Sequence, residues 1–340
     1  MKKVLVTGAN GHLGYNLTRL LVERDYDVRV SVRNIKDARK TGPLRKLAVE
    51  IVEADVMNPP SLRAAMAGMD GVFQVAAVYD ITAKHPVKDV QEPSIIGGMN
   101  VLKAAHSAGI KKIIFTSSTT AVGSDTNGGK SLTESDWNDN AVEPYAQGKM
   151  LAEKKVWEFA QKNGMNMVSI LPSAMIGPGF YRHTPTTQSF EQLLLGKVPF
   201  ALPLSFSFVD VRDSAKAHLL AYESDRATGR YIVSNHFCSL MELFKAIKQA
   251  APEIKIPTST LPVSMLPMVP LLDWIGNKLA KTPRFATAKF IEEYANKRAI
   301  FSTKKLETDL QWSADYGFST SVADTVHWVK SVFFEHRKSA

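Results

Sequence analysis

Apolar residues in the first half of the chain gather in short, nearly continuous runs, and longer stretches with a helical spacing of apolar positions lie between them. Short apolar runs are typical of strands that are buried on both faces of a parallel sheet. The pattern predicts strands over residues 4–6, 27–32, 49–53, 71–77, 112–116 and 165–171. Helices are expected between them, the longest over 92–108 and 143–161. This alternation predicts an α/β fold with a doubly wound parallel sheet.

The pattern changes after residue 171, where loops and helical spacing predominate. The elements expected there are an inserted helix, a longer helix and one more strand, over 189–195, 209–223 and 231–233. At 340 residues the chain is long enough for two domains. We expect a sheet domain of residues 1–171 and 207–235, and a smaller, mostly helical C-terminal lobe of residues 172–206 and 236–340.

The first strand leads into three glycines spaced three residues apart, Gly8, Gly11 and Gly14, and a helical pattern follows. A turn of this kind leaves free backbone N–H groups at a helix N-terminus, where a pyrophosphate binds. Glycine turns also end ordinary strands, so the position between strand and helix is what favours dinucleotide binding and a Rossmann-type domain. The residues expected to contact the cofactor here are Thr7, Gly8, Asn10, Gly11, His12, Leu13 and Gly14.

The end of the second predicted strand indicates which dinucleotide is bound. A carboxylate at this place would hold the ribose 2′-hydroxyl of NAD. The chain has Arg33 there instead, followed by Lys36, Arg39 and Lys40. These cations favour the 2′-phosphate of NADP(H), and a solvated basic helix is the alternative interpretation.

Small or polar residues also follow the next two predicted strands, whose carboxyl ends meet at one edge of the sheet. Asp55, next to Val56, would either accept a hydrogen bond from the adenine amino group or cap the following helix. Ala76, Ala77 and Val78 would let the cofactor lie against the backbone.

Tyr145 and Lys149 lie four residues apart in a predicted helix and therefore share one face of it. A free tyrosine has a pKa of about 10 and is a poor acid at neutral pH. A nearby ammonium would lower that pKa by stabilising the phenolate. A serine hydroxyl at the end of the fifth strand could then hold a substrate carbonyl oxygen while Tyr145 delivers the proton. A surface pair is the alternative, and the glycine motif upstream favours the catalytic interpretation.

These motifs together resemble the extended short-chain dehydrogenases/reductases. Residues 7–14 match the T-G-x-x-G-x-x-G motif of that family, Tyr145 and Lys149 match its Y-x-x-x-K, and residues 115–118 match the strand that supplies its catalytic serine, here Ser118. Within the family the chain is most similar to the dihydroflavonol 4-reductase and aldehyde/ketone reductase branch, a signature of which matches residues 208–218. The similarity covers nearly the whole chain and is sharpest up to about residue 235.

The resemblance implies further cofactor contacts. In this branch an arginine after the second strand and a lysine seven residues later bind the 2′-phosphate, and Arg33 and Lys40 have that spacing. A segment after the sixth strand resembles the one that lies against the nicotinamide. The residues expected to contribute from it are Pro172, Ser173, Ala174 and Ile176.

Gly123 bears on the substrate. In plant dihydroflavonol reductases an asparagine five residues after the catalytic serine reads the hydroxyls of the flavonoid ring, and the same count from Ser118 reaches Gly123. Gly123 has no side chain that could make this contact. The alternative interpretation is that Gly123 only opens a turn before the hydrophilic loop 124–129, and in either case the flavonoid contact is missing. Aromatic residues would instead form an apolar pocket. Its expected lining is Tyr79, Ser118, Phe180, Tyr181, Phe206 and Phe208.

Composition narrows the partners. A net charge of +9 raises the question of nucleic acid, yet the basic residues are scattered and lack interleaved aromatics, so an anionic small ligand explains them better. The single cysteine, Cys238, excludes an internal disulfide and fits the reducing cytoplasm, and His236 has no neighbouring ligands for a metal site. The apolar stretch 261–275 is too short and too broken by prolines for stable membrane insertion, so it is expected to be a pocket wall or a membrane-surface contact.

The sequence thus predicts a cytoplasmic, NADPH-dependent reductase, monomeric or homodimeric, that converts a carbonyl compound to an alcohol. Ser118 would orient the carbonyl, Tyr145 would act as the acid, and Lys149 would lower its pKa and hold the nicotinamide ribose. An aldehyde or ketone with aromatic or apolar substituents is the expected substrate, with a dihydroflavonol at best secondary. The enzymatic alternatives are a sugar-nucleotide epimerase or dehydratase and a 3β-hydroxysteroid dehydrogenase, and the non-enzymatic one is an NADP-sensing regulatory protein.

Overall fold

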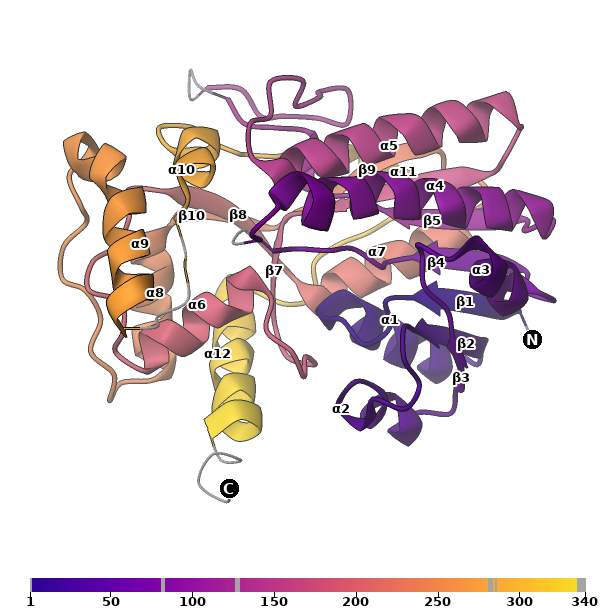
Figure 1. Cartoon of the computed structure of the whole chain (residues 1–340), viewed down its shortest axis with the longest axis horizontal. Helices are drawn as coiled ribbons and strands as arrows, with labels where there is room; N and C mark the ends of the chain where they lie inside the picture. Colours follow the sequence, from indigo (N-terminus) through magenta and orange to yellow (C-terminus); the bar gives the residue numbers. More distant parts are fainter. Residues whose placement is uncertain (1, 81–82, 126–128, 281–283, 285, 335–340) are drawn as a thin grey trace.

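The computed structural model describes residues 2–80, 83–125, 129–280, 284 and 286–334. Within them, seven parallel strands form a central sheet in the order β3-β2-β1-β4-β5-β6-β9 (Figure 1). The order reverses between β1 and β4, which leaves a crevice at the carboxyl ends of these strands, where open α/β sheets bind ligands. The strands are β1 (Lys3–Thr7), β2 (Asp27–Val32), β3 (Glu50–Glu53), β4 (Gly71–Gln74), β5 (Lys112–Thr116), β6 (Met167–Pro172) and β9 (Gly229–Val233).

Helices cover both faces of this sheet, because each presents one apolar side to it. On one face α3, α4 and α5 share an apolar cluster with Leu5 and Phe115 of the sheet. On the other face α1, α7 and α11 pack in a second cluster with Val4 and Ile114. The bounds are α1 (His12–Glu23), α2 (Ala38–Thr41), α3 (Pro59–Met66), α4 (Glu92–Ser107), α5 (Pro144–Lys162), α7 (Val211–Glu223) and α11 (Lys304–Leu310).

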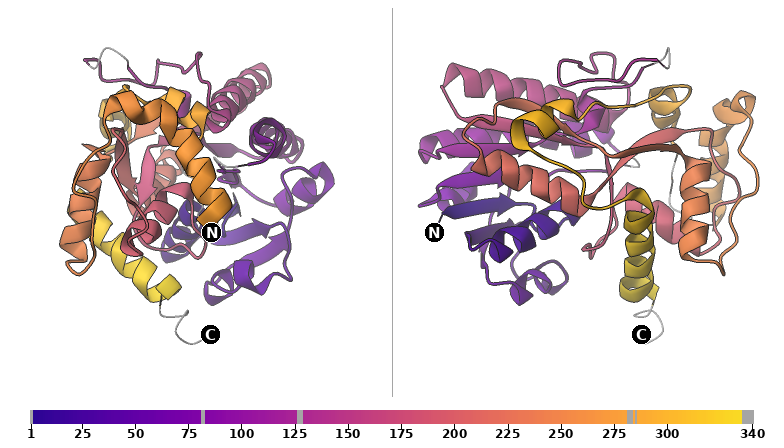
Figure 2. Two further views of the ribbon diagram at one scale, coloured as in Figure 1. Left: turned by 60° about the vertical axis from the view of Figure 1, so that its left-hand side comes forward. Right: turned by 180° about the vertical axis from the view of Figure 1, so that it is seen from behind.

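The remaining elements form a lobe beyond the carboxyl ends of the central strands (Figures 1 and 2). It contains a three-stranded sheet in the order β10-β8-β7, in which β8 pairs parallel with β7 and antiparallel with β10. The lobe comprises β7 (Ala174–Ile176), β8 (Ser205–Asp210), β10 (His236–Ser239), α6 (Pro185–Leu194), α8 (Leu240–Ala250), α9 (Val269–Ala280), α10 (Ala288–Tyr294) and α12 (Phe318–Val329).

The predicted fold class is confirmed, and two differences lie at the ends of strands. β4 ends at Gln74 rather than Ala77, because the amides of Val75 and Ala76 donate to Thr7 Oγ1 and not to a neighbouring strand. The sixth strand runs one residue beyond its predicted end, since Pro172 pairs with Val233 as the last residue of β6.

The three-stranded sheet has no counterpart among the predicted elements. The helix expected from residue 209 begins at Val211, because the preceding residues form β8 and Asp210 caps the helix by accepting from the Arg212 amide at 2.8 Å. The alternation of serine and phenylalanine in Ser205–Asp210 is a strand signal of period two.

The predicted division into two domains stays a prediction. The structure adds that one stretch of the presumed lobe belongs to the core of the central sheet. Leu306, Leu310 and Trp312 are buried in the apolar cluster that also holds α1 and α7.

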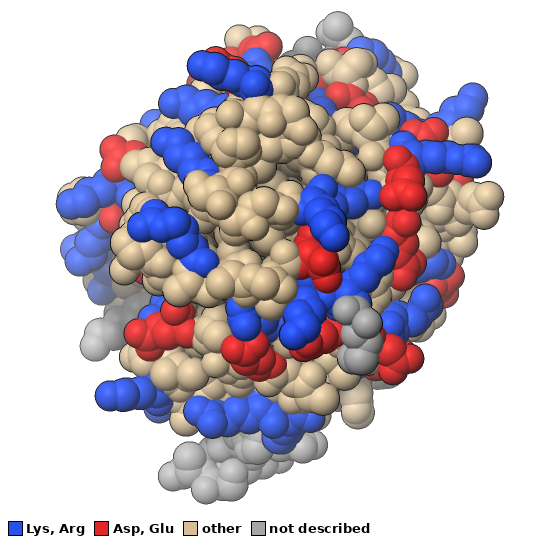
Figure 3. All heavy atoms as spheres, turned by 90° about the vertical axis from the view of Figure 1, so that its right-hand side faces the viewer, with Lys and Arg blue, Asp and Glu red and all other residues tan. Residues whose placement is uncertain are grey.

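The apolar stretch 261–275 forms a 3₁₀ helix (Val263–Met268) and most of α9. Leu266 and Val269 are buried against Ile291 of α10, while Leu271 and Trp274 are 58% and 48% exposed. Among the described helices none has the length and apolarity needed to cross a membrane. Over the face of the molecule in Figure 3, Lys and Arg are interspersed with Asp and Glu, so the excess positive charge forms no continuous surface there.

Candidate active site

The glycine-rich loop between β1 and α1 closely approaches the chain that follows β4. Gly8 has a φ of +68°, and a Cβ there would lie 2.7 Å from Ala76 Cα. A Cβ at Gly14 would lie 2.2 Å from the Gly8 carbonyl oxygen, so only glycine allows this packing. A Cβ at Gly11 would meet just that oxygen within 4 Å, which leaves the loop open to a ligand. Since the first turn of α1 has no acidic residue, its N–H groups fit the pyrophosphate of a dinucleotide.

Thr7 and Gln74 hold the chain opposite this loop. Thr7 Oγ1 accepts from the amides of Val75 and Ala76, at 3.1 Å each, and Gln74 Nε2 donates to the Ala76 carbonyl at 2.8 Å. Ala76 therefore has a fixed place against the glycine loop. The other residues expected to contribute here, Ala77 and Val78, follow without regular structure.

His12 and Asn16 of α1 bind the loop that follows β7. His12 Nε2 lies 3.1 Å from the Gly177 carbonyl oxygen, so this nitrogen carries the proton, and Asn16 Nδ2 donates to the Pro178 carbonyl at 3.0 Å. Burial lowers the pKa of His12 to about 4, although both of its carbonyl partners act to raise it. The His12 side chain is engaged by these carbonyls and Leu13 is buried in the core, so the cofactor contacts expected of both residues could come only from their backbone and stay predictions.

Asp55 acts in a local turn. Its Oδ1 accepts from the Met57 amide at 2.9 Å, while Asn58, not Asp55, caps α3. Val56 packs against α4, since its Cγ2 would lie 2.8 Å from a Cβ at Gly97. Contact of Asp55 with adenine stays a prediction.

A basic pocket borders the glycine loop beyond the end of β2. Lys40 is paired with Asp37 at 2.9 Å, and this hydrogen bond holds the pKa of the Asp37 carboxyl below its usual value. Arg33 is exposed and does not line the pocket, so of the predicted pair of phosphate ligands only Lys40 does. The lining residues are Asn10, Tyr15, Arg39, Lys40, Pro43, Leu44, Tyr181 and Arg182.

Ser118 and Tyr145 meet at the carboxyl end of β5. Ser118 is buried and its Oγ accepts from the Thr120 amide at 3.2 Å, which fixes the side chain. Tyr145 is the second residue of α5, whose N-terminus is capped by Glu143, and its hydroxyl is hydrogen-bonded to Ser118. The ring of Tyr79 lies 4.3 Å from that of Tyr145, centroid to centroid. The structure thus brings together three of the predicted site residues from separate parts of the chain.

Burial dominates the pKa values of Tyr145 and Lys149. Burial raises the pKa of Tyr145, the neighbouring Tyr79 raises it further, and the bond to Ser118 opposes both. Lys149 is buried too, donates to the Thr116 carbonyl at 3.0 Å, and has its pKa lowered to about 8 by burial. Burial thus keeps the proton on Tyr145 at neutral pH, and the effect of Lys149 on the tyrosine stays a prediction.

A buried ion pair, which the sequence did not predict, lies next to the predicted catalytic residues. Glu153, fully buried one turn after Lys149 on α5, accepts from Arg230 Nε at 2.9 Å and from Ser117 Oγ at 2.7 Å. Arg230 also stacks over Trp137, 3.6 Å from its ring centroid. Because Ser117 precedes Ser118, this network supports both the strand end and the helix that carry the predicted catalytic groups.

The lobe contacts the start of α5 through α10. Buried Glu293 accepts from the amides of Val142 and Glu143, at 2.7 and 3.1 Å, and so holds the start of α5. Tyr294 has its pKa raised well above its usual value, mainly by burial and then by Tyr79. The adjoining ring of Phe206 lies 5.5 Å from Tyr294. Glu293 and Tyr294 belong to no sequence motif, so only the acidic and aromatic character of their side chains could have indicated a role at the site.

The segment expected against the nicotinamide runs from β6 into β7. The Ser173 amide donates to the Val233 carbonyl at 2.9 Å, and Ala174 and Ile176 pair with β8. The other predicted pocket rings are divided. Phe180 and Phe208 are buried in the apolar core of the lobe, and Tyr181 lies at the basic pocket, so these three rings pack elsewhere than against Tyr145.

Gly123 has a φ of +106°, in the left-handed region, and a Cβ there would lie 3.3 Å from Asn138 Cβ. Asn138 is itself engaged, since its Nδ2 donates to Thr120 and Glu293, at 2.9 Å each. The backbone therefore favours glycine at this turn. Of the following loop, residues 126–128 lie outside the described residues.

Comparison with known proteins agrees with this geometry. The sequence model of the NAD dependent epimerase/dehydratase family matches residues 4–234. The chain is 31% identical over 273 residues to the bifunctional dihydroflavonol 4-reductase/flavanone 4-reductase of Malus domestica, covering 76% of this chain and 78% of that protein. It is 35% identical over 274 residues to cinnamoyl-CoA reductase 1 of Petunia hybrida, covering 75% and 79%.

Solved structures show the same relationship. Vestitone reductase from alfalfa (Medicago sativa L.) superposes with a TM-score of 0.71 at 26% identity, covering 97% of this chain and 99% of that one. The structure of gox2253 does so with a TM-score of 0.83 at 27% identity, covering 97% and 98%. The chain therefore belongs to the NAD dependent epimerase/dehydratase family, among the extended short-chain dehydrogenases/reductases, and is an oxidoreductase that uses a nicotinamide dinucleotide.

Proposed function

We propose that this chain is an NADPH-dependent reductase that converts an aldehyde or ketone to the alcohol. The observation that carries the proposal is the hydrogen bond between Tyr145 and Ser118 at the crevice of the sheet. The similarity to a dihydroflavonol reductase and a cinnamoyl-CoA reductase supports reduction of a carbonyl group. The basic pocket with Arg39 and Lys40 supports NADPH as the cofactor.

The side chains have separate tasks in this proposal. The nicotinamide supplies the hydride when bound. Ser118 would hold the substrate carbonyl oxygen, and Tyr145, which burial keeps protonated, would donate the proton to it. Lys149, with a pKa of about 8, carries its proton at pH 7 and would provide the positive charge that stabilises the phenolate left behind.

The rings of Tyr79, Phe206 and Tyr294 favour substrates with aromatic or apolar substituents. A panel of aldehydes, ketones, dihydroflavonols and sugar nucleotides, each with NADPH and with NADH, tests this. We expect a simple carbonyl with NADPH to have the highest kcat/KM. A better dihydroflavonol would overturn the substrate class, conversion of a sugar nucleotide would favour the epimerase alternative, and equal rates with NADH would overturn the cofactor. Tight cofactor binding without turnover of any compound would favour the regulatory alternative.

A further inference from the structure

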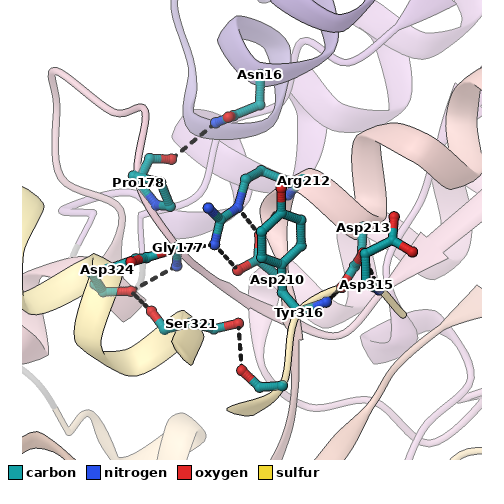
Figure 4. A network of polar contacts seen from close by, with 12 residues as sticks. Asn16, Gly177, Pro178, Asp210, Arg212, Asp213, Asp315, Tyr316, Ser321 and Asp324 are labelled. Carbon is teal, nitrogen blue, oxygen red and sulfur yellow. Dashed lines mark hydrogen bonds and ion pairs between the residues drawn. The ribbon is translucent and has the colours of Figure 1, made fainter. Parts of the chain in front are cut away.

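The loop between β7 and α6 is anchored at its start to both parts of the molecule (Figure 4). Asn16 of α1 donates to the Pro178 carbonyl at 3.0 Å, and the Gly177 amide donates to Thr325 Oγ1 of α12 at 2.7 Å. Gly177 has a φ of +111°, and a Cβ there would lie 3.0 Å from Asp210 Oδ1. The loop therefore begins at a fixed place.

An arginine bridge supports this anchor (Figure 4). Arg212 binds Asp210 at 2.8 Å and Asp324 of α12 at 2.6 Å, and its guanidinium lies 3.5 Å from the centre of the Tyr316 ring. These bonds fix the carboxylate against which Gly177 packs. Because the bridge joins α7 to α12, the loop start moves only if the lobe moves.

Further along, the same loop turns toward the glycine-rich loop. The ring of Tyr181 lies 5.3 Å from that of Tyr15 on α1 and 5.5 Å from that of Trp328 on α12, edge-on in both cases. Arg182, the next residue, lines the basic pocket together with Asn10, Arg39 and Lys40. A cation from the presumed lobe thus faces cations that follow β2.

The charges of this pocket are unbalanced. Lys40 is paired with Asp37, whereas no carboxylate in the described part of the chain pairs with Arg39 or Arg182. Both arginines are exposed, so their guanidinium groups are available to a ligand. Three cations around one carboxylate favour an anion with more than one negative charge, and guanidinium groups match the oxygens of a phosphate.

We propose that Arg182 is a cation for the 2′-phosphate of NADP(H), supplied from outside the sheet domain. This inference rests on the proposed function and adds a specificity-determining residue to it. Binding of the phosphate then joins the segment after β2 to the loop that leads into α6, which is one wall of the lobe. The 2′-phosphate, which takes no part in the hydride transfer, would thereby hold the lobe against the sheet.

The test uses the full chain and measures dissociation constants by titration of its fluorescence with NADPH, with NADH and with 2′,5′-ADP. Arg182→Ala is compared with Arg182→Lys and with Lys197→Ala, which removes an exposed lysine of the same lobe that does not line the pocket. We expect Arg182→Ala to weaken NADPH and 2′,5′-ADP about three- to tenfold, as for a partly exposed ionic contact, with NADH changed less than about twofold. Arg182→Lys should retain part of the affinity, and Lys197→Ala all of it.

The outcomes separate this inference from the proposed function. If the wild-type chain binds NADH as tightly as NADPH, the cofactor preference itself fails. If it prefers NADPH and Arg182→Ala leaves both constants unchanged, only the role of Arg182 is overturned. Equal weakening of NADPH and NADH would also overturn that role, because it would show that Arg182 maintains the loop and does not read the phosphate.

Discussion

The proposed catalytic end and the proposed phosphate end of the cofactor site are built in opposite ways. At the catalytic end Ser118 and Lys149 are 8% and 5% exposed, and burial dominates the pKa values of Tyr145 and Lys149. At the phosphate end Arg39 and Arg182 lie in solvent. Charges and dipoles act most strongly where water is excluded. We therefore expect single side chains to have large effects at the first end and small, salt-sensitive effects at the second.

The largest effect is expected for Tyr145→Phe, which removes the proton donor and keeps the ring. General acid catalysis contributes about 10²- to 10⁴-fold, so turnover of a good carbonyl substrate should fall by that factor. NADPH affinity, measured by fluorescence, should stay within about twofold because the lost hydroxyl is bonded to Ser118. A variant that kept most of its rate would show that another group donates the proton.

The buried ion pair comes next. Arg230→Met leaves the carboxylate of Glu153 without its cation in a fully buried place. Breaking such a pair costs about 3–5 kcal/mol, which urea unfolding would measure as a lower free energy of unfolding. The control is Lys3→Met, whose pair with Asp27 is 55% and 45% exposed and should contribute less than about 1 kcal/mol. If Arg230→Met and Lys3→Met lowered the free energy of unfolding equally, burial would not determine how much an ion pair contributes.

A pH effect of intermediate size is expected from His218, which is buried beside β5. Its Nδ1 lies 2.7 Å from the Ser214 carbonyl oxygen and its Nε2 lies 2.9 Å from Thr116 Oγ1, so Nδ1 carries the proton and the ring is neutral. Burial lowers its pKa from 6.5 to about 4. Above pH 6.5 His218 is neutral in both the folded and the unfolded chain. As the pH falls from 6.5 toward 4, His218 takes up a proton only in the unfolded chain, so the free energy of unfolding decreases over this range.

At pH 5 the loss from His218 should be about 2 kcal/mol relative to pH 8. Thermal unfolding across this range measures it, and His218→Gln, which cannot take up a proton, should show a weaker dependence below pH 6.5. Part of the pH dependence of stability should remain in that variant, because the pKa of His12 is also lowered to about 4. An unchanged profile would mean that His218 already titrates normally in the folded chain.

The smallest effect is expected at Arg33. Because it is exposed and does not line the basic pocket, Arg33→Ala should weaken NADPH by about tenfold or less and leave NADH unchanged. Raising the salt concentration should weaken NADPH binding to the wild type and narrow the difference from the variant. Lys46→Ala, an exposed cation outside the pocket, is the matched control. A hundredfold loss would show that Arg33 contacts the phosphate in a water-excluded place.

The parts of the site that sequence predicted are those with a local signal. The glycines of the first loop, Ser118 after its strand, and Tyr145 with Lys149 each stand in a motif tied to one element. Glu153 and Arg230 are 77 residues apart and meet only in the folded chain, so no periodicity marks them. Burial is likewise a tertiary property, which is why the raised pKa of Tyr145 has no signal in the sequence.

Residues that are adjacent in the sequence can also lie in different parts of the structure. Phe180 is buried in the core of the lobe, whereas Tyr181 and Arg182 line the pocket beyond β2. Aromatic character alone assigned the first two to one substrate pocket. The loop that carries them has no periodic pattern from which the direction of each side chain follows.

The position of Trp312 has a consequence for how the chain is made. Trp312 closes the apolar cluster of the central sheet together with Leu306 and Leu310, and its Nε1 donates to the Asp213 carbonyl at 3.1 Å. A chain growing on the ribosome from its N-terminus can form the strands early, but α1 and α7 stay partly uncovered until residues 306–312 emerge. The core of the central sheet is thus complete only after this stretch has been translated, and until then the apolar surface of α1 and α7 is open to association with other chains.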